Sequence, residues 1–281
     1  MIINNKETIF NSYLAGLFEG DGHIWLPREN NKNKNNPIFC ITFNIKDKEL
    51  AIKLLDKIGF GHIKYKTKNN ACVLIISPVK GLKRIISCIN GKLRTPKIVQ
   101  IYKLIDWLNK NHSSEIKKLG IQNDCIYNDA WLAGFIDAEG SFSIVNTKIE
   151  NGAKKRKTTS RLRLEQIMFD PISNDSYFDI LSKIAKFLNC NLRTREQKTT
   201  NNKYFTLEAS NRKSLLIIIS YFNNFPLYSS KYLDYKDWLI VSRLILEDKH
   251  YTTDGVETID YIKNNMNLKR VHFNWDHLNN L

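Results

Sequence analysis

The stretch LAGLFEGDG at Leu14–Gly22 recurs near the middle of the chain as LAGFIDAEG at Leu132–Gly140. Both copies place small residues four positions apart, apolar residues between them, an acid at the eighth position and a glycine at the ninth. Residues four apart share one face of a helix, and a face of small residues lets two helix backbones approach closely. We therefore predict that the two copies form helices that pack against each other, with Gly22 and Gly140 as their C-terminal caps.

Length and charge set the broad class of the protein. The chain has 281 residues, of which 42% are hydrophobic, and its formal net charge is +15. This length and the internal repeat favour two domains, each with a core of its own. The positive charge indicates a polyanionic partner, with nucleic acid ahead of an anionic membrane surface. No apolar run approaches the ~18 residues that a membrane span needs, so we expect no membrane partner.

Hydrophobic periodicity predicts the same order of elements in both halves: helix, two strands, helix, two strands and further helices. Hairpin-like strand pairs in this order indicate the α+β class, with two tandem αββαββα units that each build an antiparallel sheet covered on one face. The segments Ile76–Leu82 and Ala209–Leu215 align within the repeat. The predicted parts are a first unit at 1–108, a linker at 109–128, a second unit at 129–250 and a tail at 251–281.

The eighth-position acids, Asp21 and Glu139, are predicted to lie at the last turns of the two packed helices. Two carboxylates there repel each other and the partial negative charge of each helix C-terminus. A divalent cation relieves that repulsion, and Mg²⁺ (or Mn²⁺) prefers carboxylate, backbone carbonyl and water ligands. The nearest backbone candidates are the carbonyls of Gly20 and Ala138. The ordinary alternative, two acids at helix ends without a special role, is disfavoured because both copies place the acid identically in a basic protein.

A cation held between two acids beside a phosphodiester can activate water and stabilise the leaving oxygen. The acids two residues upstream, Glu19 and Asp137, are expected instead to face solvent or to bond locally.

Both nonapeptides resemble the signature of LAGLIDADG homing endonucleases, and the likeness extends over about residues 8–247. Two copies match the double-motif, single-chain type. The segments Asn90–Lys97 and Ser229–Tyr235 resemble members encoded in fungal mitochondrial group I introns, notably those of cytochrome oxidase subunit 1. The resemblance implies a saddle of two antiparallel sheets along the DNA major groove, and metal-dependent hydrolysis that leaves a staggered double-strand break. It also implies a monomer that is an internal pseudo-dimer, and mitochondrial localisation.

Residue by residue, the resemblance makes Asp21 and Glu139 the metal-binding acids. It places the active-site lysine of the family on Lys97 and Lys231, which would otherwise be surface lysines at helix starts. The family often has a glutamine at the end of the second strand of each half, where Asp47 and Met168 stand here, with Gln166 close to the second place. Methionine cannot position water, so the expectation includes strand nicking or a loss of cleavage.

Basic side chains mark the expected nucleic-acid surface. Alternate strand positions share one sheet face, and arginine, lysine and asparagine on such a face can read base edges in the major groove. The strand positions are Lys64, Lys66, Lys68, Arg161, Arg163, Arg193 and Arg195. Loop residues predicted to contact phosphates are Lys32, Lys34, Lys154, Lys155, Arg156 and Lys157. Any one of them is more often simply solvated; the set, with the net charge, favours binding.

Three functions fit these features. A site-specific DNA endonuclease acting on double-stranded DNA is the first. An RNA-binding maturase that helps its own group I intron to splice is the second, since the same basic surfaces would serve it. A DNA-binding regulator is the third, and it is disfavoured because such a protein has no need of the two acids.

Overall fold

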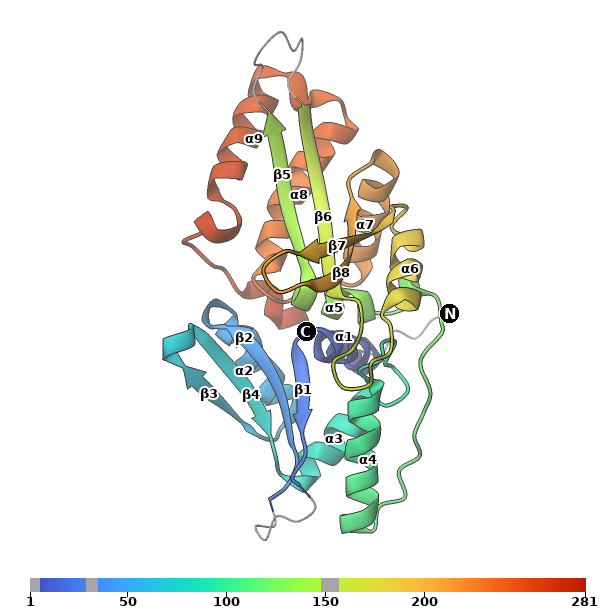
Figure 1. Ribbon diagram of the computed structural model, residues 1–281. Coiled ribbons are helices and arrows are strands. Elements are labelled where there is room, and N and C mark those ends of the chain that lie inside the picture. The colour runs from blue at the N-terminus through green and yellow to red at the C-terminus, as the bar shows by residue number, and fades with distance from the viewer. Residues whose placement is uncertain (1–5, 29–34, 148–156) are drawn as a thin grey trace. The chain divides into compact units, whose positions relative to one another are not determined.

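Each half of the chain folds into a four-stranded antiparallel sheet that carries helices on one face (Figure 1). The structure is a computed structural model, and it describes residues 6–28, 35–147 and 157–281. The predicted α+β class and the repeated order of elements are confirmed.

The first sheet has the strand order β1-β2-β4-β3. Its strands are β1 (Gly22–Trp25), β2 (Ile38–Asn44), β3 (His62–Lys66) and β4 (Ala71–Ile76). The helices of this half are α1 (Lys6–Asp21), α2 (Lys48–Ile58), α3 (Val79–Ile89) and α4 (Ile98–His112). Alternation along β2 explains the sheet, because Phe39, Ile41 and Phe43 are buried against the helices while Thr42 and Asn44 are not.

The second sheet repeats this arrangement in the order β5-β6-β8-β7. Its strands are β5 (Gly140–Thr147), β6 (Lys157–Ile167), β7 (Leu192–Gln197) and β8 (Asn202–Ala209). The helices are α5 (Trp131–Glu139), α6 (Phe178–Phe187), α7 (Arg212–Asn224), α8 (Lys231–Leu246) and α9 (Thr253–Asn265). Helices α8 and α9 both contact β5, so the predicted tail covers part of this sheet.

The registers of the two sheets define equivalent positions. Gly22 pairs with Ile41, which pairs with Leu74; in the second sheet the corresponding series is Gly140, Leu164 and Leu207. Counting onward makes Ile76 equivalent to Ala209, as the sequence alignment of the two segments predicts.

The predicted equivalence of Asp47 and Met168 is wrong. Asp47 lies as far beyond Ile41 as Asp170 lies beyond Leu164, so Asp170 is its counterpart. Met168 continues the pairing of β6 with β8, because its N–H donates to the carbonyl of Lys203. Asp47 instead ends a short 3₁₀ turn that precedes α2. Strand register follows from cross-strand pairing, which spacing along the chain does not reveal.

The described residues form two compact units whose limits differ from the predicted parts. Unit 1 comprises Met1–Ala138, Phe169–Tyr177 and His277–Leu281, and unit 2 comprises Glu139–Met168 and Phe178–Asp276. Unit 1 therefore includes most of α5, because that helix packs against α1. The predicted linker also belongs to unit 1, where the N–H of Gln122 donates to the carbonyl of Leu93.

In unit 2 the chain after α8 is held by side chains. The amide of Asn146 on β5 donates to Asp260 on α9 over 2.7 Å. Arg270 forms ion pairs with Asp234 at 3.0 Å and with Asp237 at 2.6 Å, both on α8. Throughout the part of the chain that the structure describes, every helix is too short or too polar to cross a membrane.

Candidate functional site

The two motif helices touch at their glycines. A Cβ built on Gly16 would lie 1.9 Å from the carbonyl oxygen of Trp131, and one built on Gly134 would lie 2.0 Å from that of Tyr13. Real Cβ atoms never approach a backbone oxygen so closely, so only glycine allows this contact. The predicted packing of the two helices is confirmed.

The closing glycine has another role than the predicted one. Gly22 is the first residue of β1 and its φ lies outside the left-handed region, so it is not a C-cap of that type. A Cβ there would lie 2.3 Å from the Phe18 ring. Gly140 likewise begins β5. The chain thus passes from helix to strand without a turn, and glycine provides room for the ring one helical turn earlier.

Glu19 is fully buried, contrary to the prediction that it faces solvent or bonds locally. Its carboxylate accepts hydrogen bonds from the N–H of Arg94 at 2.9 Å and from both the N–H and the Oγ1 of Thr95 at 2.6 Å. The indole N–H of Trp131 donates to the same carboxylate at 2.5 Å. Burial raises the pKa of Glu19 to about 7, although these hydrogen bonds oppose the shift.

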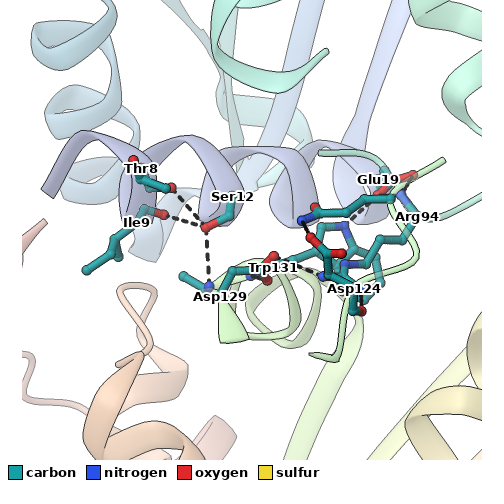
Figure 2. A network of polar contacts seen from close by, with 10 residues as sticks. Thr8, Ile9, Ser12, Glu19, Arg94, Asp124, Asp129 and Trp131 are labelled. Carbon is teal, nitrogen blue, oxygen red and sulfur yellow. Dashed lines mark hydrogen bonds and ion pairs between the residues drawn. The ribbon is translucent and has the colours of Figure 1, made fainter. Parts of the chain in front are cut away.

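The loop that binds Glu19 contains Arg94 and Thr95, and the Arg94 side chain links it to the start of α5. The guanidinium of Arg94 donates to the carbonyl of Asp124 and pairs with Asp129 at 2.9 Å, just before α5 begins (Figure 2). In the middle of α1, the Ser12 hydroxyl accepts the N–H of Ala130. Helix α1, the loop before α4 and the start of α5 are therefore joined through one buried polar network.

Asp137, at the position equivalent to Glu19, is also buried and not exposed as predicted. It accepts a hydrogen bond from the Tyr13 hydroxyl at 2.8 Å. The aromatic residue before each motif therefore binds the sixth-position acid of the other motif, since Trp131 binds Glu19. An aromatic with a polar atom before each copy and an acid inside it was the available signal for this pairing.

Lys97 lies at the N-terminus of α4, and its ammonium group reaches the end of α1. Its Nζ donates to the carbonyls of Gly20 at 2.6 Å and Gly22 at 3.1 Å, on either side of Asp21. Its own N–H donates to Thr95 Oγ1, which fixes that hydroxyl to donate to Glu19. The buried network thus holds the loop that carries Lys97.

The end of α1 suits a cation. Asp21 has an exposed carboxylate, and the Gly20 carbonyl that is predicted as a metal ligand already accepts the Lys97 ammonium. The helix-terminal carbonyls therefore attract positive charge, and the Asp21 carboxylate beside them is an oxygen donor of the kind that divalent ions prefer.

Of the predicted site residues in the second repeat, Glu139 and Lys231 lie in unit 2, whereas Ala138 is in unit 1. Glu139 lines a shallow hollow of about 380 Å³ with Ser141, Arg163, Glu165 and Arg195. Lys231 is the first residue of α8 and is partly exposed, and its N–H donates to Ser229 Oγ. Ala138 precedes Glu139 at the end of α5.

Most of the predicted nucleic-acid residues that the structure describes lie on exposed strand positions, but Lys68, predicted on a strand, is in a 3₁₀ turn, and Lys157, predicted in a loop, is on a strand. Lys64 and Lys66 are on β3, Lys68 follows it, and Lys157 begins β6; all four are exposed. Three of the four arginines are ion-paired: Arg161 with Glu208 at 3.3 Å, and Arg163 and Arg195 with Glu165. Arg193 is an exposed residue of β7. Lys32, Lys34, Lys154, Lys155 and Arg156 lie outside the described residues.

Replacing Glu19 by glutamine should lower the free energy of unfolding by about 3 kcal/mol, because the new amide would meet donors and leave one of them buried without an acceptor. Urea unfolding measures the effect. Glu7→Gln is the matched control on the same helix, since Glu7 is half-exposed and pairs with Arg84 at the surface. Equal stability of the two variants would contradict the role given to the network.

Comparison with known proteins places the chain in a family. The sequence profile described as LAGLIDADG endonuclease matches residues 14–108 and 132–242, one match in each repeat. The chain is 31% identical to the intron-encoded DNA endonuclease aI3 of Saccharomyces cerevisiae, over 95% of this chain and 72% of the yeast protein. The chain belongs to the LAGLIDADG endonuclease family. The predicted resemblance is thereby confirmed.

Three further proteins are similar to this chain in sequence or in fold. A cox1 intron-2 protein of Schizosaccharomyces pombe is 34% identical over 90% of this chain and 72% of its own length. The intron-encoded RNA maturase bI4 of S. cerevisiae is 31% identical over 50% of this chain and 20% of its own length. The I-SmaMI LAGLIDADG homing endonuclease, solved bound to cleaved DNA, has the same fold, with a TM-score of 0.73 and 21% identity over 93% of this chain and 98% of I-SmaMI.

Proposed function

We propose that this protein is a site-specific DNA endonuclease that makes a staggered double-strand break by metal-dependent hydrolysis of a long target. The observation that carries the proposal is the Lys97 ammonium bound to the carbonyls beside Asp21, at the end of the first motif helix. A carboxylate and an ammonium group at the end of one helix are groups that can take part in phosphodiester hydrolysis, in a chain that belongs to an endonuclease family.

Asp21 and Glu139, with the carbonyls of Gly20 and Ala138, are the proposed ligands of Mg²⁺ or Mn²⁺. When bound, the ion supplies positive charge at the scissile phosphate and lowers the pKa of a water molecule. Because the Gly20 carbonyl binds the Lys97 ammonium, Asp21 is the principal ligand on this side.

Lys97 and Lys231 are the proposed basic groups of the two halves. An ammonium group beside the scissile phosphate stabilises the charge that develops on its oxygens and can orient water. Lys97 is suited to this because three carbonyl contacts and the Thr95–Glu19 hydrogen bonds fix its position.

The proposed partner is double-stranded DNA, bound across the exposed sheet faces by the basic strand residues. The net charge of +15 supports strong phosphate binding. Both repeats stand in one chain, so the proposed active form is a monomer, which sedimentation on target DNA would test. Mitochondrial localisation is proposed from the intron-encoded relatives.

Supercoiled plasmid that carries the uninterrupted insertion site of the host gene should be linearised when Mg²⁺ is present. Chelation by EDTA should stop the reaction, and binding should weaken steeply with added salt because counterions are released from DNA. The matched control is the same plasmid with the intron in place, which splits the target. Tight binding to the uninterrupted site without any cleavage would refute the endonuclease.

A maturase that assists splicing of its own group I intron is the second candidate, favoured by the likeness of half the chain to the yeast RNA maturase bI4. Splicing of precursor RNA at limiting Mg²⁺, with and without the protein, tests it. Faster splicing by a protein that leaves the DNA target intact would favour the maturase over the endonuclease.

A further inference from the structure

The two sheets carry different chemistry at equivalent positions of their open faces. Directly paired residues share a sheet face, so the registers identify both the equivalent positions and the face that each side chain occupies. On the central strands, the equivalent pairs are Ile38 and Arg161, Cys40 and Arg163, Val73 and Thr206, and Ile75 and Glu208. At each of these four positions, an apolar residue of the first sheet is matched by a polar or charged residue in the second.

On the central strands of the first sheet, the open face is mostly apolar, with Thr42 and Asn44 as polar members. Ile38 and Ile75 are half-buried, and the neighbouring Trp25 is 43% exposed. Among the described residues of these four strands, this face has no acid and no arginine, and its lysines, Lys64 and Lys66, lie on the edge strand β3. Such a face offers methyl and ring contacts at its centre and positive charge at its border.

The open face of the second sheet is a network of hydrogen-bonding charges. Glu165 bridges two guanidinium groups, that of Arg163 at 2.5 Å and that of Arg195 at 2.9 Å. Arg161 pairs with Glu208 at 3.3 Å across neighbouring strands. A carboxylate that holds two guanidiniums fixes their directions, so the arginines present their remaining donors in a defined orientation.

We infer that the two faces read the two halves of the DNA target by different chemistry: the first sheet by contact with thymine methyl groups, and the second by hydrogen bonds to G·C pairs. This inference rests on the proposed DNA endonuclease function. It assigns specificity in the first half to Ile38 and Ile75, and in the second to Arg161 together with the Glu165-bound arginines.

The major groove supports this division. Thymine alone presents a methyl group there, and apolar side chains contact it, whereas arginine binds guanine O6 and N7 and glutamate accepts from the cytosine amine. The lysines of β3 and the arginines of β7 occupy equivalent edge positions in the two sheets, Lys64 with Arg193 and Lys66 with Arg195. Phosphate attraction is thus common to both halves, and the difference lies in the central strands.

Two base analogues, placed in the intact DNA duplex that the protein cleaves, test the inference. Uracil in place of thymine removes only the methyl group, and 7-deazaguanine removes only the N7 acceptor. Uracil should weaken binding of one half-site by about fourfold for each contacted thymine. 7-Deazaguanine should weaken binding of the other half-site by about tenfold for each contacted guanine.

Matched variants assign each half-site to a sheet. Ile38→Ala should remove the uracil effect at the thymine that Ile38 contacts and leave the 7-deazaguanine effect. The equivalent Arg161→Gln should remove the 7-deazaguanine effect at the guanine that Arg161 contacts and leave the uracil effect. Ile75→Ala provides a second variant of the first face. Each variant serves as the control for the other, because the half-site that it does not contact should respond as in the unchanged protein.

The outcomes separate this inference from the proposed function. A protein that neither binds nor cuts the natural target refutes the endonuclease itself. A protein that binds and cuts the target, but tolerates uracil throughout or shows both analogue effects in the same half, overturns the division between the faces while the endonuclease stands.

Discussion

Replacing Asp21 by asparagine should reduce DNA cleavage by more than about 100-fold, because loss of a direct ligand exceeds the effect of losing a residue that only orients one. The amide keeps the size of the side chain but removes the negative charge that anchors the proposed ion. Glu139→Gln should have the same effect through the second repeat. Single-turnover cleavage of a short duplex at saturating protein measures the chemical step directly.

Affinity for DNA should remain within a few-fold of the unchanged protein in both variants, measured by fluorescence anisotropy in Ca²⁺. The matched control is Asp56→Asn, which removes an exposed carboxylate from α2 without touching the motif helices. If Asp21→Asn or Glu139→Gln cleaved DNA as fast as the unchanged protein, the replaced acid could not be a ligand of the catalytic ion. A loss of cleavage with a parallel loss of affinity would show that the acid acts through folding or binding instead.

Replacing Gly16 by alanine should destabilise unit 1 by about 3 kcal/mol or more, because the new methyl group would overlap a backbone oxygen that cannot move aside alone. The Cβ would lie 1.9 Å from the Trp131 oxygen and 2.8 Å from the Phe135 nitrogen. Gly134→Ala should be equally severe, since its Cβ would lie 2.0 Å from the Tyr13 oxygen. Thermal unfolding should show a melting temperature lower by about 10 °C.

Gly120→Ala is the matched control for this prediction. Gly120 is exposed and a Cβ built on it meets no atom within 4 Å. That variant should leave stability unchanged or raise it slightly, because alanine narrows the conformations of the unfolded chain. If the Gly16→Ala and Gly120→Ala proteins had the same melting temperature, that result would contradict the close approach of the two helices.

The sequence predicts the helix pair because glycine spacing on one helix face has a direct packing consequence. It also predicts the order of elements, since alternation and helical periodicity are local properties. The buried state of Glu19 is not predictable in this way, because its donors, Arg94, Thr95 and Trp131, lie far along the chain. An acid in a short motif looks solvated until those distant donors are known.

Two further differences have the same origin. The equivalence of Asp47 with Asp170 depends on cross-strand register, which spacing from the motif does not reveal. The assignment of α5 to unit 1 depends on packing, whereas the repeat boundaries follow from pattern alone. Local patterns therefore predicted the elements, and contacts between distant segments decided how those elements are grouped.

The crossed pairing of Tyr13 with Asp137 and of Trp131 with Glu19 has a consequence for exchanging halves between homologous proteins. A half brought in from a relative supplies one aromatic and one acid, and each must suit its counterpart from the resident half in length and in donor. A tyrosine hydroxyl facing the longer glutamate, or an indole facing the shorter aspartate, would leave a polar atom buried beside a mismatched neighbour. Successful recombinants should therefore inherit these four residues as a set, whatever surfaces they contribute to recognition.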